Sequence, residues 1–343
     1  AATAFVTDIH VAWLTYGLGV GIGAACAYIP TFAVVGGWFD KWRTRALSIA
    51  AAGTGLGQAL LHNVDGQFIP SPSEGGHADY AARTERDVKV LRDLIDVRTA
   101  LSSAERRAPA ELVAAIDRLA PMLRFFRHGD GGLALFNGAW ETDRTLVDLV
   151  LARSGSNEPA PLTALQSGFL RLNAGTTQVV VDAGSPPGRG MDELAHAGTL
   201  SFEMSAAHER LVVNCGIYPG APVEWRRFMR YTAAHSTAVV DDTNSTEITD
   251  HGAMEYRAGN VLIDRADDQG AQWLDMCHDG YRSLFGIIHR RRLWLSPDGG
   301  DLRGEDMFLG PEGKPVAHPD KRFIIRFHLH PTVKATLAQS GQA

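Results

Sequence analysis

Histidine and tyrosine side chains in the second half of the chain have the chemistry for proton transfer. His196 precedes the segment SFEMSA, and His235 lies within TAAHSTAVVDDT. His278 and Tyr281 share the short segment HDGY. Imidazole and phenol groups are common proton carriers in general acid–base catalysis. These four residues are the predicted catalytic candidates, and the alternative is that they are hydrogen-bonded structural residues of strands and turns.

Four further residues are candidates for binding an acidic sugar. His77 follows two glycines, and Asn137 in FNG could hydrogen-bond a carboxylate. Strand alternation places Arg290 and Arg292 on one face and Arg291 on the other, so the pair could bind an anionic polymer. The alternatives are a loop histidine, a turn asparagine and a solvated arginine face.

The composition excludes several classes of function. The 343 residues include 33 Lys and Arg against 39 Asp and Glu, a net charge of −6, which gives no reason to expect a nucleic-acid partner. Three widely spaced cysteines form neither a disulfide framework nor a zinc ribbon. No phosphate-binding loop or nucleophile elbow is present, and the glycines of GLGVGIG lie in an apolar stretch.

The first 61 residues have the composition of membrane helices. No charged residue occurs between Val11 and Phe39, which is longer than the roughly 20 apolar residues that a bilayer span needs. The basic segment DKWRTR follows, and then 16 uncharged residues. We therefore predict membrane association through residues 11–61. If both segments cross, the remainder faces the periplasm, tethered to the inner membrane, and otherwise it is cytoplasmic.

The rest of the chain changes from helical to strand-like patterning. Residues 62–160 contain three amphipathic helical segments, the second of which Pro121 should kink or interrupt. From residue 161 short runs alternate with a period of two, separated by Gly, Asp, Asn and Pro. We predict an α+β multidomain protein with apolar helices (1–61), a short helical region (62–160) and a large antiparallel β-sandwich (161–343) that lacks its last strands.

Two resemblances to known families support this division. The segment LTYGLGVGIGAACAYIPTFAVVGGWFDKWRTRALSIAAAGTGLG, within residues 5–61, resembles monocarboxylate-transporter-like members of the major facilitator superfamily. Residues 75–343 resemble the heparinase II/III-like family of polysaccharide lyases. The segments that carry this second resemblance include RLAPMLRFFRHGDGGLALFNG, LAHAGTLSFEMSAAHERLVVNCG, HDGY and IHRRRLWLSPDGGDLRGED.

The heparinase resemblance implies a fold and a reaction. Family members carry an α/α toroid before the sandwich, of which residues 62–160 would be a remnant. They cleave uronic-acid polysaccharides by β-elimination. Their His-x-His-x-Asp pattern falls on Leu194, His196 and Gly198, so the usual catalytic histidine is a leucine here. The family's metal ligands fall on His196, Asn214 and His235, which implies a zinc site with a neutral amide in place of a carboxylate.

Three hypotheses for function follow. The first is a lyase-type protein, a carbon–oxygen lyase that acts on an acidic polysaccharide in the cell envelope, either active or inactive in this form. The second is a non-catalytic carbohydrate-binding or envelope protein that uses the same sandwich. The third is a fragment of a major facilitator transporter fused to a passenger. The sequence gives no indication of the oligomeric state.

Overall fold

The computed structural model describes residues 84–164, 167–188, 192–255, 258–316 and 321–336. The predicted membrane segment 11–61 and His77 lie outside these residues. None of the helices within the described residues is long and apolar enough to cross a bilayer. Residues 93–112 belong to one compact unit, and residues 84–92 and 113–336 belong to a second.

Three longer helices precede the strands, as predicted: α4 (Thr84–Ser103), α5 (Ala110–Phe125) and α6 (Arg144–Ser154). The Asp143 side chain accepts a hydrogen bond from the Thr145 amide at the start of α6, and Gly155 ends it with a left-handed φ of 71°. Contrary to the predicted interruption, α5 continues through Pro121. Three short helical turns follow later: α7 (Val223–Phe228), η2 (Thr232–Ala234) and α8 (Arg282–Phe285).

The first sheet has six strands in the order β1-β2-β3-β4-β5-β14, and every neighbouring pair is antiparallel. Their bounds are β1 (Thr163–Ala164), β2 (Phe169–Ala174), β3 (Thr177–Asp182), β4 (Phe202–Ala206), β5 (Glu209–Val213) and β14 (His328–Leu329). Consecutive strands pair through short turns over most of this sheet. Only β14 arrives from far along the chain.

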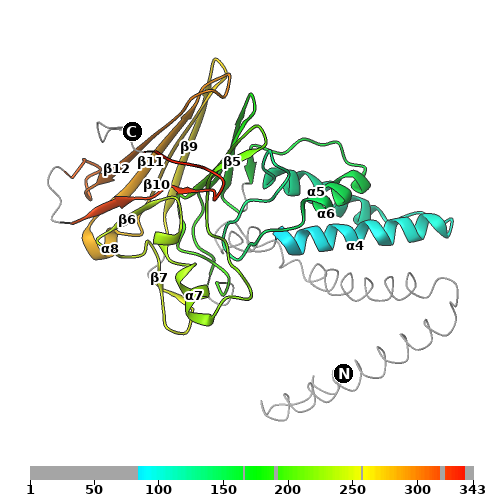
Figure 1. The fold of residues 1–343 in the computed structure, drawn as a ribbon, viewed down its shortest axis with the longest axis horizontal. Helices are drawn as coiled ribbons and strands as arrows, with labels where there is room; N and C mark the ends of the chain where they lie inside the picture. Colours follow the sequence, from blue (N-terminus) through cyan, green and yellow to red (C-terminus); the bar gives the residue numbers. More distant parts are fainter. Residues whose placement is uncertain (1–83, 165–166, 189–191, 256–257, 317–320, 337–343) are drawn as a thin grey trace, which may run out of the picture. The chain divides into compact units, whose positions relative to one another are not determined.

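The second sheet has four long strands in the order β12-β11-β10-β9, which lie side by side in Figure 1. Their bounds are β9 (Val261–Asp268), β10 (Ala271–His278), β11 (Ile288–Leu295) and β12 (Leu302–Leu309). Two small ribbons complete the strands: β6 (Ala238–Val240) with β13 (Phe323–Ile325), and β7 (Glu247–Ile248) with β8 (Met254–Glu255). No strand occupies residues 333–336, although the sequence predicts one there.

The two larger sheets pack face to face around an apolar core, as the period-two patterning predicts. Leu172, Val181 and Phe202 project from the six-stranded sheet onto Leu274 and Leu293 of the four-stranded sheet. The opposite face of the six-stranded sheet is covered by a cluster of aromatic rings. This second cluster contains Phe125, Phe126, Phe136, Phe169 and Val180. It packs the end of α5 and the loop that follows it onto β2 and β3.

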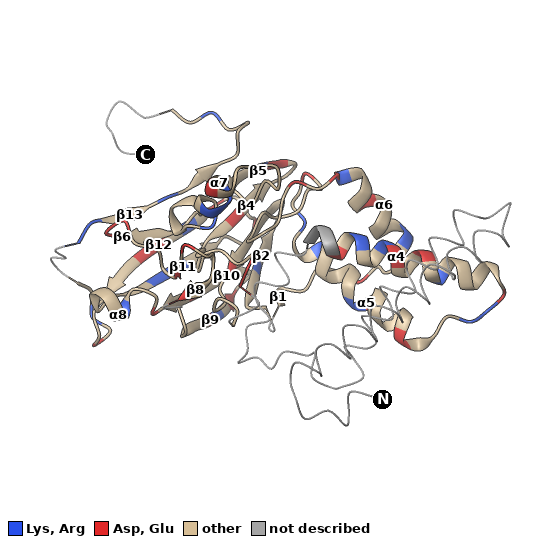
Figure 2. Ribbon diagram, turned by 90° about the horizontal axis from the view of Figure 1, so that it is seen from below, with Lys and Arg blue, Asp and Glu red and all other residues tan. Residues whose placement is uncertain are grey.

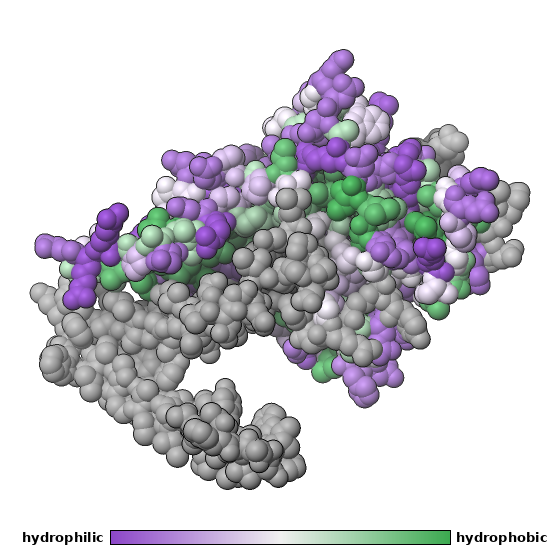
Figure 3. Space-filling view, turned by 180° about the vertical axis from the view of Figure 1, so that it is seen from behind, coloured by the Kyte–Doolittle hydropathy of each residue, from purple (hydrophilic) through white to green (hydrophobic). Residues whose placement is uncertain are grey.

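The predicted class of antiparallel sheets with few helices is therefore confirmed for the described residues. The boundaries at residues 61 and 160, and the interpretation of residues 62–160 as a remnant of a toroid, stay predictions. Basic and acidic residues are interspersed over helices and strands alike in Figure 2. In the space-filling view, green hydrophobic areas interrupt the hydrophilic surface of the described residues (Figure 3).

Candidate functional site

His196 lies in the loop that leads into β4. Its backbone amide donates a hydrogen bond of 2.9 Å to the Asn137 side-chain oxygen. Both residues are buried, and they come from segments 59 positions apart. The loop before β4 and the loop after α5 are thus joined where the sequence predicts a catalytic and a binding residue.

His196 and His235 form a buried pair. Nδ1 of His196 lies 3.2 Å from Nε2 of His235, so one ring donates a hydrogen bond to the other. Burial lowers the pKa of His196 well below its ordinary value, and the neighbouring His235 and Arg230 lower it further. Burial also lowers the pKa of His235, to about 3, with a contribution from His328. Both rings are therefore neutral in the folded protein at neutral pH.

Asn214, the third predicted metal ligand, has both side-chain atoms engaged elsewhere. Its nitrogen donates to Glu203 Oε1 over 3.3 Å, and its oxygen accepts from the Ser236 amide over 3.0 Å. The described ranges contain no group of three or more His, Cys, Asp or Glu side chains suited to a metal. Two imidazoles and an engaged amide do not fit zinc, which prefers thiolate, imidazole and carboxylate ligands. His196, Asn214 and His235 therefore do not fit a zinc ion in this arrangement, and we assign zinc no part in a reaction.

A fully buried carboxylate, which the sequence analysis did not identify, organises the site. Glu203 Oε1 accepts hydrogen bonds from the amides of Leu135 and Asn214, at 2.9 and 3.1 Å. Oε2 lies 3.0 Å from Nε2 of His128, whose other ring nitrogen lies 3.0 Å from the Ser205 hydroxyl. Ser205, His128 and Glu203 resemble a nucleophilic triad in the order of their contacts. All three are buried, so the arrangement fastens the loop after α5 to β4.

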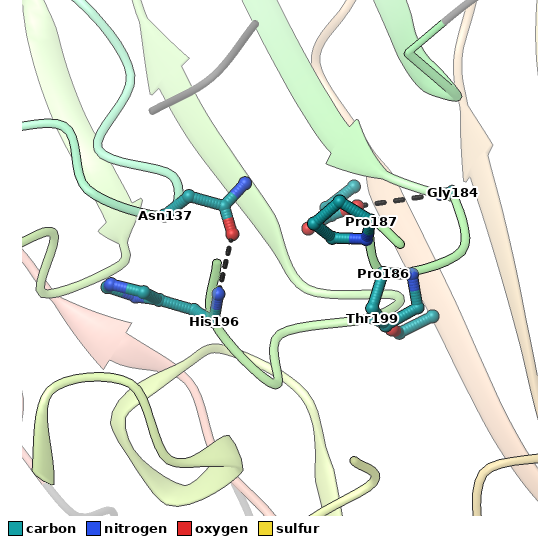
Figure 4. Close-up of a pocket in the computed structure, with 7 residues that line it drawn as sticks. Asn137, Gly184, Pro186, Pro187, His196 and Thr199 are labelled. Carbon is teal, nitrogen blue, oxygen red and sulfur yellow. Dashed lines mark hydrogen bonds between the residues drawn. The ribbon is translucent and has the colours of Figure 1, made fainter. Parts of the chain in front are cut away.

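A pocket borders the contact between Asn137 and His196. It is lined by Asn137, Asp182, Gly184, Pro186, Pro187, His196 and Thr199, with an empty volume of about 180 Å³ that includes some open solvent. Asn137 faces it from a left-handed backbone conformation with a φ of 52°. Figure 4 shows the Asn137 oxygen turned toward the His196 amide, while the His196 ring is directed away from Pro186, Pro187 and Thr199. In this conformation the pocket therefore contains an amide donor but not an imidazole.

Leu194 stands at the edge of the same region. Its side chain is 40% exposed, and a Cβ added to Gly138 would lie 3.0 Å from the Leu194 Cβ. Position 194 is the one that the family resemblance assigns to a catalytic histidine. An aliphatic side chain therefore packs against the Asn137–Gly138 turn where that resemblance implies an imidazole.

His278 and Tyr281 lie close to each other but are buried among different residues. Their ring centroids are 5.6 Å apart, and the Tyr281 hydroxyl donates to the Ala238 carbonyl over 2.9 Å. Burial raises the pKa of this phenol far above its ordinary value. The Gly280 amide donates to Nδ1 of His278, so Nε2 of His278 carries the proton that it donates to Nδ1 of His289, 3.2 Å away.

The hydrogen-bond chain continues from His289 to a carboxylate. Nε2 of His289 donates to Asp306 over 2.7 Å, and Arg291 contacts both oxygens of Asp306. Burial alone would raise the pKa of Asp306, but the hydrogen bond from His289 and the charge of Arg291 hold it below its ordinary value. The HDGY residues thus belong to a buried hydrogen-bond chain in the second sheet, and none of them lines the pocket.

The three arginines of β11 alternate as predicted. Arg291 is buried and donates to the carbonyls of Leu200 and Ser236, whereas Arg290 and Arg292 are partly exposed on the other face. Both exposed arginines pair with Asp275. Their charge is therefore partly neutralised within the sheet.

Comparison with known proteins assigns the sandwich to a family. A family model described as heparinase II/III-like, C-terminal, matches residues 158–343, and a glucokinase family model matches residues 30–107. FtsZ-localized protein C of Caulobacter vibrioides is 33% identical over 298 residues, which are 83% of this chain and 50% of that protein. Human monocarboxylate transporter 14 is 34% identical over 59 residues, 12% of its length.

Solved structures show the same fold at low sequence identity. A heparinase III has a TM-score of 0.53 and 17% identity over 78% of this chain and 44% of its own. A mutant of heparan sulfate lyase HepC from Pedobacter heparinus has a TM-score of 0.52 and 14% identity over 79% of this chain and 43% of its own. The chain spans about half the length of the curated relative with the longest match above, and less than half of these two lyases.

Proposed function

Because the chain belongs to the heparinase II/III-like family, we propose that it is the sandwich-bearing part of a polysaccharide lyase-type protein. Its ligand in this proposal is a polysaccharide that contains uronic acid, and the reaction class is β-elimination. The observation that carries the proposal is the Asn137 carboxamide, held by the His196 amide at the pocket on the family's sandwich. Its nitrogen is a suitable donor to a uronate carboxylate.

β-Elimination makes three demands on a site. A donor must offset the uronate charge so that the C5 proton becomes acidic, a base must remove that proton, and an acid must protonate the leaving glycosidic oxygen. Asn137 fits the first demand. His196 is the candidate for a proton carrier, because its ring is neutral and Nε2 has no hydrogen-bond partner within the described residues. For this role its ring would have to turn toward the pocket, away from His235.

The second candidate function is binding of the polysaccharide without cleavage. Two observations favour it: Leu194 occupies the position of the expected catalytic histidine, and the His196 and His235 rings are engaged with each other. The curated relative with the longest match above is named for its localisation with FtsZ and not for a lyase activity. Location in the cell envelope is part of the proposal, and fractionation of the native cells tests it.

One experiment separates the two functions. The purified chain is incubated with heparan sulfate, alginate and other uronates, and the ultraviolet absorbance of the unsaturated product is followed. Absorbance that rises with time on one of these polymers supports cleavage. A flat trace on every polymer, with retention of the chain on a polysaccharide column, supports binding alone. If the chain neither cleaves any of these polymers nor is retained on the column, the proposed function is refuted.

A further inference from the structure

An exposed aromatic surface surrounds α7 in the segment after β5. Tyr218, Val223, Trp225 and Phe228 are 66%, 68%, 60% and 51% exposed, and they are called the α7 surface below. Large apolar side chains concentrated within eleven residues cost free energy in water unless a ligand covers them. The α7 surface is therefore a candidate binding site outside the pocket.

The aromatic rings of the α7 segment are arranged in a connected series. The centroids of Trp225 and Phe228 are 6.3 Å apart with the rings nearly perpendicular, and those of Phe228 and Tyr231 are 5.6 Å apart. Edge-to-face contacts of this kind fix ring orientation. The solvent-facing parts of Trp225 and Tyr218 stay free for a ligand. Aromatic faces carry negative charge density, which attracts the polarised C–H bonds of a sugar ring.

Arginine side chains accompany the rings. Arg226 and Arg227 lie between Trp225 and Phe228 in the chain, and both are partly exposed. Nη2 of Arg227 pairs with Asp250 over 2.7 Å. Nε of both arginines is buried without a hydrogen-bond partner within the described residues, so only the ends of the guanidinium groups can reach a ligand. Guanidinium groups bind carboxylates and sulfates through charge-assisted hydrogen bonds. Aromatic faces beside arginine favour a sugar polymer with acidic groups over a neutral one.

The α7 surface is joined directly to the loop that carries His196. Arg230, just after α7, donates to the carbonyls of Ala195 and Asp192 over 2.7 and 2.8 Å. Its own carbonyl accepts from the Ala197 amide over 2.9 Å. The Arg230 side chain is buried, so these bonds hold α7 against the loop.

We propose that the α7 surface is a capture site for an acidic polysaccharide, with Trp225 and Tyr218 stacking on sugar rings and Arg226 binding a carboxylate or sulfate. The proposal rests on the proposed function and adds a second contact region to it. A polysaccharide bound to the α7 surface would lie close to the His196 loop, because the hydrogen bonds of Arg230 hold α7 against that loop. Stacking and one charged contact would add to the affinity that the pocket amide provides.

The test measures dissociation constants of the full chain for fluorescent heparan sulfate and alginate fragments, with neutral dextran as a comparison. Trp225→Ala is compared with Trp273→Ala, because Trp273 is 44% exposed on β10 and lies beside Trp294. We expect Trp225→Ala to weaken binding of the acidic fragments about 3- to 10-fold, the loss of one stacking contact. Trp273→Ala is expected to leave binding unchanged, and Arg226→Gln to reduce the salt dependence of binding.

The outcomes separate this proposal from the proposed function. Equal affinities of Trp225→Ala and the unsubstituted chain overturn the capture site while leaving the proposed function intact. Loss of self-association in Trp225→Ala, with polysaccharide affinity unchanged, also overturns it and assigns α7 to a contact between two copies. If the unsubstituted chain neither binds nor cleaves any acidic fragment, both proposals fail. Circular dichroism of each variant confirms that the exposed substitutions leave the fold intact.

Discussion

Nδ1 of His196 lies 3.2 Å from Nε2 of His235, and both residues are almost completely buried. One N–H proton lies between the two neutral imidazoles, so one ring is the donor and the other the acceptor. Residues predicted to work on a substrate are thus partners of each other in the folded protein. Burial is the main cause of the low pKa of both residues. The contact with His235 lowers the pKa of His196 further, and His328 lowers that of His235.

Stability should depend on pH through these rings. The unfolded chain takes up protons near pH 6.5, whereas folded His235 does so only near pH 3. The contribution of these histidines to the free energy of unfolding is therefore fully present above about pH 7. It decreases as the pH falls, by up to ~1.4 kcal/mol per pH unit for each such histidine. Urea unfolding of His235→Leu at pH 7, 6, 5 and 4 should show a smaller slope. Exposed His251→Leu is the control, and an unchanged slope in His235→Leu contradicts the assignment.

Replacement of Glu203 should strongly destabilise the sandwich. Glu203→Gln places a donor nitrogen among groups that already donate, which are the amides of Leu135 and Asn214 and the His128 ring. An unsatisfied buried group of this kind costs about 1–3 kcal/mol, and more where a charge is involved. Chemical denaturation measures the loss. Glu209→Gln, exposed at the start of β5, should change stability by less than about 0.5 kcal/mol.

Asn214→Asp should make the stability of the protein depend on a bound metal ion. The new carboxylate would lie about as far from Glu203 as the present amide does, 3.3 Å, so the two charges would repel without a cation. We expect lower stability in chelator and recovery in zinc, because a ligand that binds only the folded state stabilises it. Thermal unfolding and metal analysis measure both effects, with Asn173→Asp as the exposed control. Tight zinc binding by the unsubstituted chain would contradict this account.

Replacement of Asn137 by glycine tests whether its carboxamide binds the ligand. Asn137 has a φ of 52°, which glycine adopts freely, so Asn137→Gly removes the carboxamide with little backbone strain. We expect weaker binding of acidic fragments, about 5-fold or more, because one hydrogen bond to a charged group is lost. Asn137→Ala should bind as weakly and also unfold more easily. Unchanged affinity in both variants would remove Asn137 from the ligand site.

Leu194→His tests whether the chain has lost a catalytic base. Position 194 is 40% exposed beside the Asn137–Gly138 turn, so an imidazole there would reach solvent and keep a pKa suited to proton transfer. If that base is the missing group, ultraviolet absorbance on a bound uronate should rise faster than with the unsubstituted chain. Leu194→Gln, similar in size and without a titrating group, should not accelerate the reaction. Equal rates in the two variants would show that more than this base is absent.

Much of the sandwich follows from alternation of apolar residues along the strands. The opposite orientations of Arg291 and its two neighbours are an example, because burial on one face is a local property of the strand. Strand β12 has no such signal, since LRGEDMFL has adjacent acidic residues and no regular alternation. Several sequence segments in the same order as in the family indicate the family of the sandwich. No segment of the sequence indicates the match of residues 30–107 to a glucokinase family model.

The site was harder to predict than the fold because its contacts join distant segments. Glu203 has the pattern of a polar residue in a half-exposed strand, and only the arrival of His128 and Leu135 explains its burial. His196 lies in a loop fixed by Asn137, a residue 59 positions earlier in the chain. A single sequence contains no local signal for such pairings. The roles of the candidate residues and the membrane segment stay predictions.

The last described residues close two open edges at once. β13 pairs with β6, and a few residues later β14 pairs with Val212 and Val213 of β5. Unpaired strand edges with valine-rich sequences are templates for pairing with other chains. The short stretch Phe323–Leu329 therefore covers two such edges as well as completing the sheets. A protein shortened before Arg322 would present both edges to its neighbours in solution, and insolubility would then be the first consequence.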